Sequence, residues 1–317
     1  MSVSALAFAT LALLLVGPVP ALLARASWPL RAPRAAVVLW QSIAVAAVLS
    51  AFSAGIAIAS KLFVPGPDGR PTTLLGEIDQ LGWPLWALSI AVFGLTLLIG
   101  ARLVVAGAQV FVSTRRRRFH HRTLVDILGV THDRAAAQAC TRARELRILD
   151  VAQPLAYCLP GVRSRVVVSE GALTSLADAE VTAILTHESA HLRARHDLVL
   201  EAFTAVYVAF PRFVRSRNAL DAVRLLIELL ADDAAVRAAG PTPLARALVA
   251  CASARAPKGA LAAGGPTTVI RVRRLTGRPN SVPLAAAAYL SAVAILVLPT
   301  IAVAVPWLHE LQRLFSS

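Results

Sequence analysis

Four long apolar segments constrain the fold of this chain more than any other feature of its sequence. They cover Ser2–Ala24, Ala35–Ser60, Trp83–Val112 and Val282–Leu308. A helix needs about 20 mainly apolar residues to cross a bilayer, and each segment is long enough. Hydrophobic residues make up 57% of the sequence and charged residues 16%, against roughly 25% charged residues in a soluble domain. We therefore predict a mainly α, polytopic membrane protein with four transmembrane helices.

Two of these segments contain residues that are unusual in a membrane span. Gly17, Pro18 and Pro20 lie within the first segment, so we expect a kink there. No basic residue precedes its apolar run, which distinguishes it from a cleaved signal peptide. Arg102 is a charged residue within the third segment, and two interpretations stay open. Either it has a function inside the membrane, or its side chain reaches the cytoplasmic interface.

The distribution of basic residues predicts the orientation of the spans. The link between the first two segments carries three arginines and no acid, whereas the Lys61–Gly82 loop is slightly acidic. The run RRRRFHHR at Arg115–Arg122 follows the third segment. Lys and Arg concentrate in cytoplasmic loops, so we predict that both termini lie outside the cell. Residues 113–280 then form a cytoplasmic domain between the membrane regions 1–112 and 281–317.

The net charge of +14 raises the question of whether the chain binds nucleic acid or anionic lipid. The excess lies mainly in residues 113–280, which hold 25 Lys and Arg but 14 Asp and Glu. Aromatic residues do not alternate with these charges, as they do on surfaces that stack on bases. We therefore expect the charges to face the lipid bilayer, with no direct nucleic-acid binding. Two groups of basic residues make up this face: His120 and His121 with the arginines around them, and a second collar at Arg271, Arg273, Arg274 and Arg278.

The stretch Glu180–Asp197 carries the clearest chemical motif of the sequence, H-E-x-x-H at His187, Glu188 and His191. Apolar residues recur through it at helical spacing, and it lacks Pro and Gly. Positions i and i+4 of a helix lie on the same face, so both imidazoles can bind one metal ion. Catalytic zinc accepts such ligands and keeps one position open for water. A carboxylate beside that water can take its proton, which is the metallopeptidase interpretation of this motif.

A second helical run, Leu225–Val236, contains a candidate third ligand. Glu228 lies there among apolar residues, where a carboxylate is costly to bury without a partner. It would complete a His, His, Glu set, a known combination at catalytic zinc. Asp232 follows four residues later on the same face, and we predict that it hydrogen-bonds a ligand imidazole. The predicted cofactor is therefore Zn²⁺, bound by His187, His191 and Glu228.

The order of these motifs resembles the gluzincin-type membrane metallopeptidases, and within them the BlaR/MecR-type sensor-transducer family. The resemblance covers about Arg142–Arg237. Pro154–Leu173 is similar to the hairpin and Gly turn before the catalytic helix of that family, and Ala209–Arg215 is similar to its Phe-His-Pro segment. The sequence departs from the family at Phe210, which stands at the His of that segment, and at Ala231, where the second helix often has Cys.

The resemblance implies a cytoplasmic α+β gluzincin-like zinc metallopeptidase domain between spans three and four. It also implies a protein substrate, a winged-helix transcriptional repressor of the BlaI type, and cleavage of the protease itself. Family members that sense beta-lactams carry a penicillin-binding domain after the last span, whereas this sequence stops at Ser317. We therefore expect a signal to enter through the spans, the Lys61–Gly82 loop or a partner protein.

Several residues around the two zinc helices are candidates for further roles. Glu188 is expected to pass the proton of the water to the leaving amine. The oxyanion needs another donor, and three residues stay open for this role: Tyr157, His196 and Arg224. The run Arg165–Ser169 follows a Pro-Gly turn and is expected to be a strand. The resemblance implies that this strand is a sheet edge that pairs with substrate, and an ordinary hairpin is the alternative; its residues are Arg165, Val166, Val167 and Val168.

Three further expectations concern local structure. Ser175 and Asp178 should cap the first zinc helix. Leu198–Val214 should form a buried or membrane-grazing helix, with a fifth span as the alternative. The three cysteines should be free thiols in a reducing cytoplasm; they are Cys140, Cys158 and Cys251.

Two other functions compete with a signalling protease. One is a quality-control metalloprotease that trims damaged membrane proteins. The other is a catalytically silent membrane scaffold in which zinc only holds the fold together. Glu188 argues against the scaffold, because a structural zinc site does not need a general base.

Overall fold

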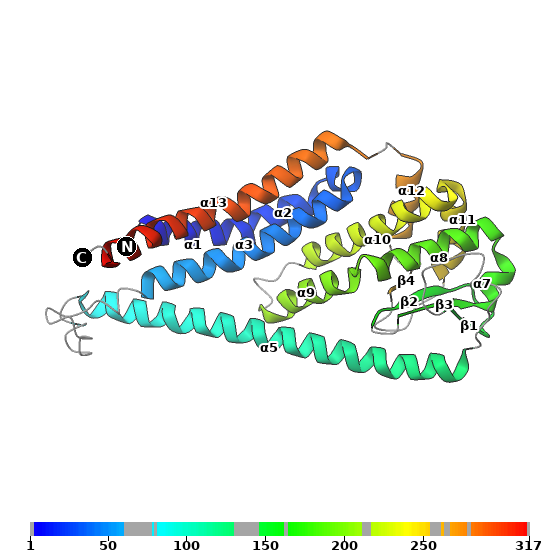
Figure 1. Ribbon diagram of the computed structural model, residues 1–317, viewed down its shortest axis with the longest axis horizontal. Coiled ribbons are helices and arrows are strands. Elements are labelled where there is room, and N and C mark those ends of the chain that lie inside the picture. The colour runs from blue at the N-terminus through cyan, green and yellow to red at the C-terminus, as the bar shows by residue number, and fades with distance from the viewer. Residues whose placement is uncertain are drawn as a thin grey trace.

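The computed structural model describes residues 3–59, 78, 81–129, 146–161, 164–210, 217–253, 261–262, 267–277 and 280–315. These residues are mostly helical and form an elongated molecule, with a helical bundle at one end and a small sheet with short helices at the other (Figure 1). Both chain ends lie at the bundle end, far from the sheet (Figure 1). Most of the predicted Lys61–Gly82 loop lies outside the described residues, and so does Cys140.

Among the described residues, four helices are long and apolar enough to cross a membrane, as predicted. The first is interrupted at Gly17, which divides it into α1 (Val3–Val16) and α2 (Pro18–Arg25). The others are α3 (Pro33–Ala59), α5 (Trp83–Leu128) and α13 (Val282–Phe315). Helix α5 does not end at Val112 but continues through the basic run for 46 residues in all. Arginine favours helix, so nothing in that run stops it.

The bundle packs in two layers around α3, with a short 3₁₀ turn at Trp28–Arg31 before it. One side of α3 packs against α1 and α13 through small and aliphatic residues such as Leu39, Ile43 and Ala292. Another side, which includes Trp40, packs against a helix of the domain, α10 (Arg217–Ala239). The domain is therefore joined to the spans by direct packing as well as by the chain.

Helix α9 (His196–Ala209) lies along α5 and corresponds to the predicted helix at Leu198–Val214. Residues 211–216 are outside the described part of the chain. The Nε of Arg102 donates a hydrogen bond of 2.8 Å to the carbonyl of Ala209. The last carbonyls of a helix lack partners within it, so Arg102 caps α9 and ties it to α5.

In the described part of the chain, the sheet has four short strands in the order β1 (Leu146–Leu149), β3 (Arg165–Ser169), β2 (Ala156–Leu159) and β4 (Leu261–Ala262). The predicted hairpin is confirmed, since β2 and β3 pair antiparallel. The interpretation of Arg165, Val166, Val167 and Val168 as a substrate-binding edge is wrong. Strand β3 pairs with β1 on one side and β2 on the other, so its backbone groups are already used.

The core of the domain lies between the sheet and its helices. These helices are α7 (Glu170–Ser175), α8 (Asp178–Arg193), α11 (Pro241–Ala250), which ends in a 3₁₀ turn at Cys251–Ser253, and α12 (Thr268–Leu275). The buried faces of β3, α8 and α11 meet in one apolar cluster, which includes Val166, Val168, Ile184, Leu185, Leu244 and Leu248. This cluster fixes α8 against the sheet and so positions the H-E-x-x-H motif.

Candidate active site

The H-E-x-x-H motif lies on α8, where His187, Glu188 and His191 are buried. The carboxylate of Glu180 accepts a hydrogen bond of 3.1 Å from the backbone N–H of Ala177 just before the helix. Ser175 does not cap α8, contrary to the prediction, because it belongs to α7 and its hydroxyl donates to the carbonyl of Gly171. Asp178 is the first residue of α8, where an acidic side chain favours the helix dipole.

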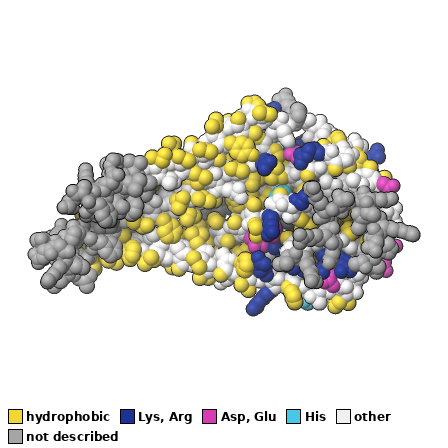
Figure 2. All heavy atoms as spheres, in the orientation of Figure 1, with side chains coloured by type: hydrophobic (Ala, Val, Ile, Leu, Met, Phe, Trp, Pro, Cys, Tyr) yellow, Lys and Arg dark blue, Asp and Glu magenta, His cyan; other side chains and the backbone are white. Residues whose placement is uncertain are grey.

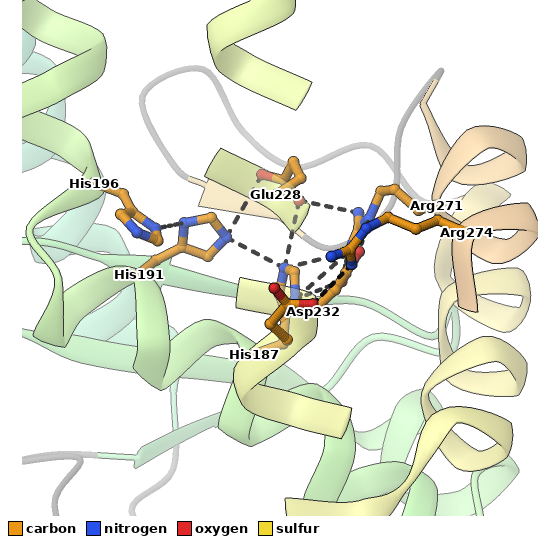
Figure 3. Close-up of polar contacts among 8 residues, drawn as sticks. His187, His191, His196, Glu228, Asp232, Arg271 and Arg274 are labelled. Atoms are coloured by element: carbon orange, nitrogen blue, oxygen red, sulfur yellow. Dashed lines mark hydrogen bonds and ion pairs between the residues drawn. The ribbon is translucent and has the colours of Figure 1, made fainter. Parts of the chain in front are cut away.

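Three ligand atoms from α8 and α10 converge on one point (Figure 3). The Nε2 atoms of His187 and His191 are 3.2 Å apart. The carboxylate oxygens of Glu228 lie 3.4 Å from His187 Nε2 and 3.5 Å from His191 Nε2. A tetrahedral zinc ion with bonds of about 2.0–2.1 Å separates its ligand atoms by about 3.3 Å. The spacing and the N, N, O donor set therefore fit zinc.

Glu188 is fully buried beside these ligands. Neither of its carboxyl oxygens makes a well-formed hydrogen bond to a described residue, although the Cys158 thiol, a weak donor, lies next to them. Burial raises the pKa of Glu188 to about 8, with a further contribution from the negative charge of Glu228. A carboxyl group with a pKa near neutrality can both take and release a proton, which is what a general base at this position needs.

Asp232 lies one turn beyond Glu228 on α10. Its carboxylate is 3.0 Å from Nδ1 of His187 (Figure 3). Burial lowers the pKa of His187, but hydrogen bonds to Asp232 and Glu228 outweigh it and raise the pKa to about 9. A carboxylate on Nδ1 leaves Nε2 of the neutral ring free to bind a metal.

Arg271 is a site residue that sequence reasoning missed. The sequence pattern assigns it to a basic collar that faces the bilayer, but its side chain is 1% exposed and points into the site from α12 (Figure 3). Its Nε donates to Asp232 at 2.8 Å and a second nitrogen donates to the other carboxylate oxygen at 2.5 Å. Its remaining nitrogen lies 2.9 Å from Glu228. A buried cluster rich in carboxylates needs a cation. The presence of Glu228 and Asp232 in the predicted site was therefore the sequence signal that pointed to a buried basic residue.

The other collar residues behave differently from Arg271. Arg273 is exposed, and Arg278 lies outside the described residues. Arg274 pairs with Asp233 at 2.8 Å, and its Nε donates a 2.7 Å hydrogen bond to the carbonyl of Leu30, in the turn before α3. Helix α12 therefore joins the metal site to the link between the first two spans.

The three candidate oxyanion donors have different surroundings in the structure. Tyr157 is buried on the α5 side of the sheet, 3.0 Å from His121, and burial raises its pKa to about 12. Arg224 is half exposed and pairs with Asp221. His196 lies behind His191, with the Nδ1 atoms of the two rings 2.9 Å apart (Figure 3).

The two histidines of the basic run have different surroundings. His120 is exposed, whereas His121 contacts the buried Tyr157. Cys158 and Cys251 are free thiols. Burial raises the pKa of both, to about 11 for Cys251, so these thiols are expected to be unreactive at neutral pH.

Comparison with known families matches residues 131–279 to the model of peptidase family M48, a family of zinc metallopeptidases. The matched segment contains α8, α10 and α12, and so every residue of the cluster described above. Neither the curated proteins nor the solved structures contain a match to the chain. The match supports the metallopeptidase part of the predicted resemblance. The BlaR/MecR-type relationship stays a proposal.

Proposed function

We propose that this protein is a membrane-embedded zinc-dependent endopeptidase whose active site faces the cytoplasm. The observation that carries the proposal is the convergence of His187, His191 and Glu228 ligand atoms within 4.8 Å of one another beside Glu188. The match to peptidase family M48 covers the same residues. A structural zinc site would have four protein ligands, whereas the described residues bring three together, the number found at catalytic zinc sites that bind a water molecule.

The proposed site residues have two kinds of role, metal binding and proton transfer. His187, His191 and Glu228 would hold zinc, which when bound activates a water molecule and polarises the scissile carbonyl. Glu188 takes the proton of the attacking water and delivers it to the leaving amine. Asp232 orients His187 through Nδ1, and Arg271 holds the carboxylates of Asp232 and Glu228 in place.

We further propose that the enzyme transduces a signal by cleaving a cytoplasmic transcriptional repressor. The resemblance to sensor-transducer proteases supports this role, and so does the packing of the spans. Helix α10, which carries Glu228, packs directly against the membrane helix α3. A movement of α3 would therefore act on a zinc ligand without passing through a flexible linker.

The test compares cells that produce the wild-type protein with cells that produce Glu188→Gln. The variant keeps all three ligands, so we expect it to retain zinc and to lose cleavage by at least about a hundredfold. Glu170→Gln is the matched control, because Glu170 is exposed at the start of α7. Cleavage products are identified by comparing the two proteomes for shortened proteins.

Each outcome separates the proposed roles. A single DNA-binding protein shortened in wild-type cells would support the signalling protease and identify its substrate. Many shortened membrane proteins would instead favour quality control. Equal cleavage by wild type and Glu188→Gln would overturn the peptidase mechanism, and zinc without cleavage in either would favour a silent scaffold.

A further inference from the structure

His196 forms a buried contact with a proposed zinc ligand. Its side chain belongs to the first residue of α9 and is 5% exposed. The rings of His196 and His191 meet edge to face, with centroids 4.9 Å apart and an angle of 82°. Their Nδ1 atoms are 2.9 Å apart, a normal hydrogen-bond distance (Figure 3).

The turn between α8 and α9 produces this contact. Arg195 has a φ of 51°, in the left-handed region that non-glycine residues seldom adopt. This conformation ends α8 abruptly and brings His196 back against the last turn of that helix. A strained backbone persists where surrounding contacts hold it, and here the buried His196 ring supplies such a contact.

The direction of the hydrogen bond follows from the position of the ligand atoms. His191 Nε2 faces His187 and Glu228, so Nε2 is the atom available to a metal. A neutral imidazole that binds metal through Nε2 carries its hydrogen on Nδ1. His191 Nδ1 therefore donates, and His196 Nδ1 accepts.

The acceptor is unusual, because ligand imidazoles generally donate to a carboxylate, a carbonyl or water. A carboxylate is close in sequence, but Asp197 pairs with Arg118 of α5 at 3.0 Å instead. The two ligand histidines thus have different partners. His187 has the anionic Asp232 on its Nδ1, and His191 has the neutral ring of His196.

We propose that His196 is a positioning residue that holds His191 in its metal-binding tautomer and orientation. The inference rests on the proposed zinc site. A neutral acceptor makes His191 a weaker electron donor than His187, which leaves more positive charge on the bound metal. Partners of this kind typically contribute 10–100-fold to metal affinity.

The experiment measures the zinc dissociation constant of the full-length protein in detergent micelles by competition with a chromogenic chelator. His196→Leu fills the space but accepts no hydrogen bond, and we expect it to weaken zinc binding about 10–100-fold. His196→Asn places an amide oxygen near the position of Nδ1, and we expect its affinity to stay within about threefold of wild type. His196→Asp supplies an anionic acceptor and should bind zinc more tightly than wild type.

A control and two further results make the outcome decisive. His121→Leu removes another histidine that contacts a buried ring, and it should not change zinc affinity. Wild-type affinity in His196→Leu, or equal weakening in the Leu and Asn variants, would overturn the inference. If His196→Leu does not fold, the zinc affinities of His196→Asp and His196→Asn decide. An affinity of His196→Asp no higher than that of His196→Asn would then contradict the inference. Failure of the wild-type protein to bind zinc would refute the proposed function itself.

Discussion

Several ionisable side chains share the buried site, and their charges must nearly cancel. In the metal-free protein the pKa values of His187 and Glu188, about 9 and about 8, keep both groups protonated at pH 7. The positive charges of His187 and Arg271 then balance the negative charges of Glu228 and Asp232. Zinc brings two positive charges, and the loss of one proton each from His187 and Glu188 restores the balance.

We therefore predict that zinc binding at pH 7 releases about two protons from the wild-type protein. Glu188→Gln has one group fewer to deprotonate and should release about one. The apparent zinc affinity should rise with pH and level off above about pH 9, because the raised pKa of His187 makes protons compete below that value. Titration calorimetry in buffers of different ionisation enthalpy measures the protons released, and equal release by the two proteins would contradict the prediction.

A second prediction at the residue scale concerns Arg271. Replacing it with Met removes one of the two cations beside Glu228 and Asp232, and breaking such a buried ion pair typically costs about 3–5 kcal/mol. We expect Arg271→Met to lower the unfolding temperature of the metal-free protein strongly, and zinc to restore part of the loss. Arg273→Met, on the exposed side of the same helix, should leave the unfolding temperature unchanged. Similar unfolding temperatures for both variants in micelles would show that Arg271 does not stabilise the site.

At the scale of helices, α3 and α5 approach each other closely at a glycine. A Cβ added at Gly55 of α3 would overlap the hydroxyl and methyl of Thr96 on α5. Small residues allow membrane helices to approach closely, and packing contributes much of their association. Gly55 is therefore expected to fix the distance between these two spans.

We predict that Gly55→Val separates α3 from α5 and destabilises the protein by about 1–3 kcal/mol, the usual cost of overpacking. Gly94→Val is the matched control, because a Cβ at Gly94 of α5 meets nothing within 4 Å. Thermal unfolding in micelles compares the two variants. The role of Gly55 is refuted if they unfold at the same temperature.

The elements that the sequence predicts well are those with a local, repeating pattern. The four apolar helices, α8 and α10 each have such a pattern, and the β2–β3 hairpin has a Pro-Gly turn between two apolar runs. Strands β1 and β4 have four and two residues, too few for a period to be seen. The position of Arg271 is also hard to predict from the sequence. In the run R-V-R-R it reads as exposed, and its partner Asp232 lies 39 residues away in sequence.

For the whole molecule, the distribution of charge predicts which end faces the cytoplasm. On the face shown in Figure 2, apolar side chains predominate over the described part of the bundle, while Lys, Arg, Asp and Glu gather toward the domain. The basic run of α5 lies at the domain end of that helix, and so does Arg274, which contacts the link between the first two spans. The three basic regions lie at the same end of the apolar helices, so the positive-inside rule predicts that this end faces the cytoplasm.

The last prediction tests this orientation with two matched substitutions. Thr174→Cys places a thiol at an exposed position of the domain, and Thr72→Cys places one in the acidic loop between the second and third spans. Both are made with Cys140→Ala, while Cys158 and Cys251 are buried and need no replacement. A membrane-impermeant maleimide should label Thr72→Cys in intact cells and Thr174→Cys only in inside-out vesicles. Labelling of Thr174→Cys from outside would place the zinc site on the opposite side of the membrane, where it could not reach a cytoplasmic repressor.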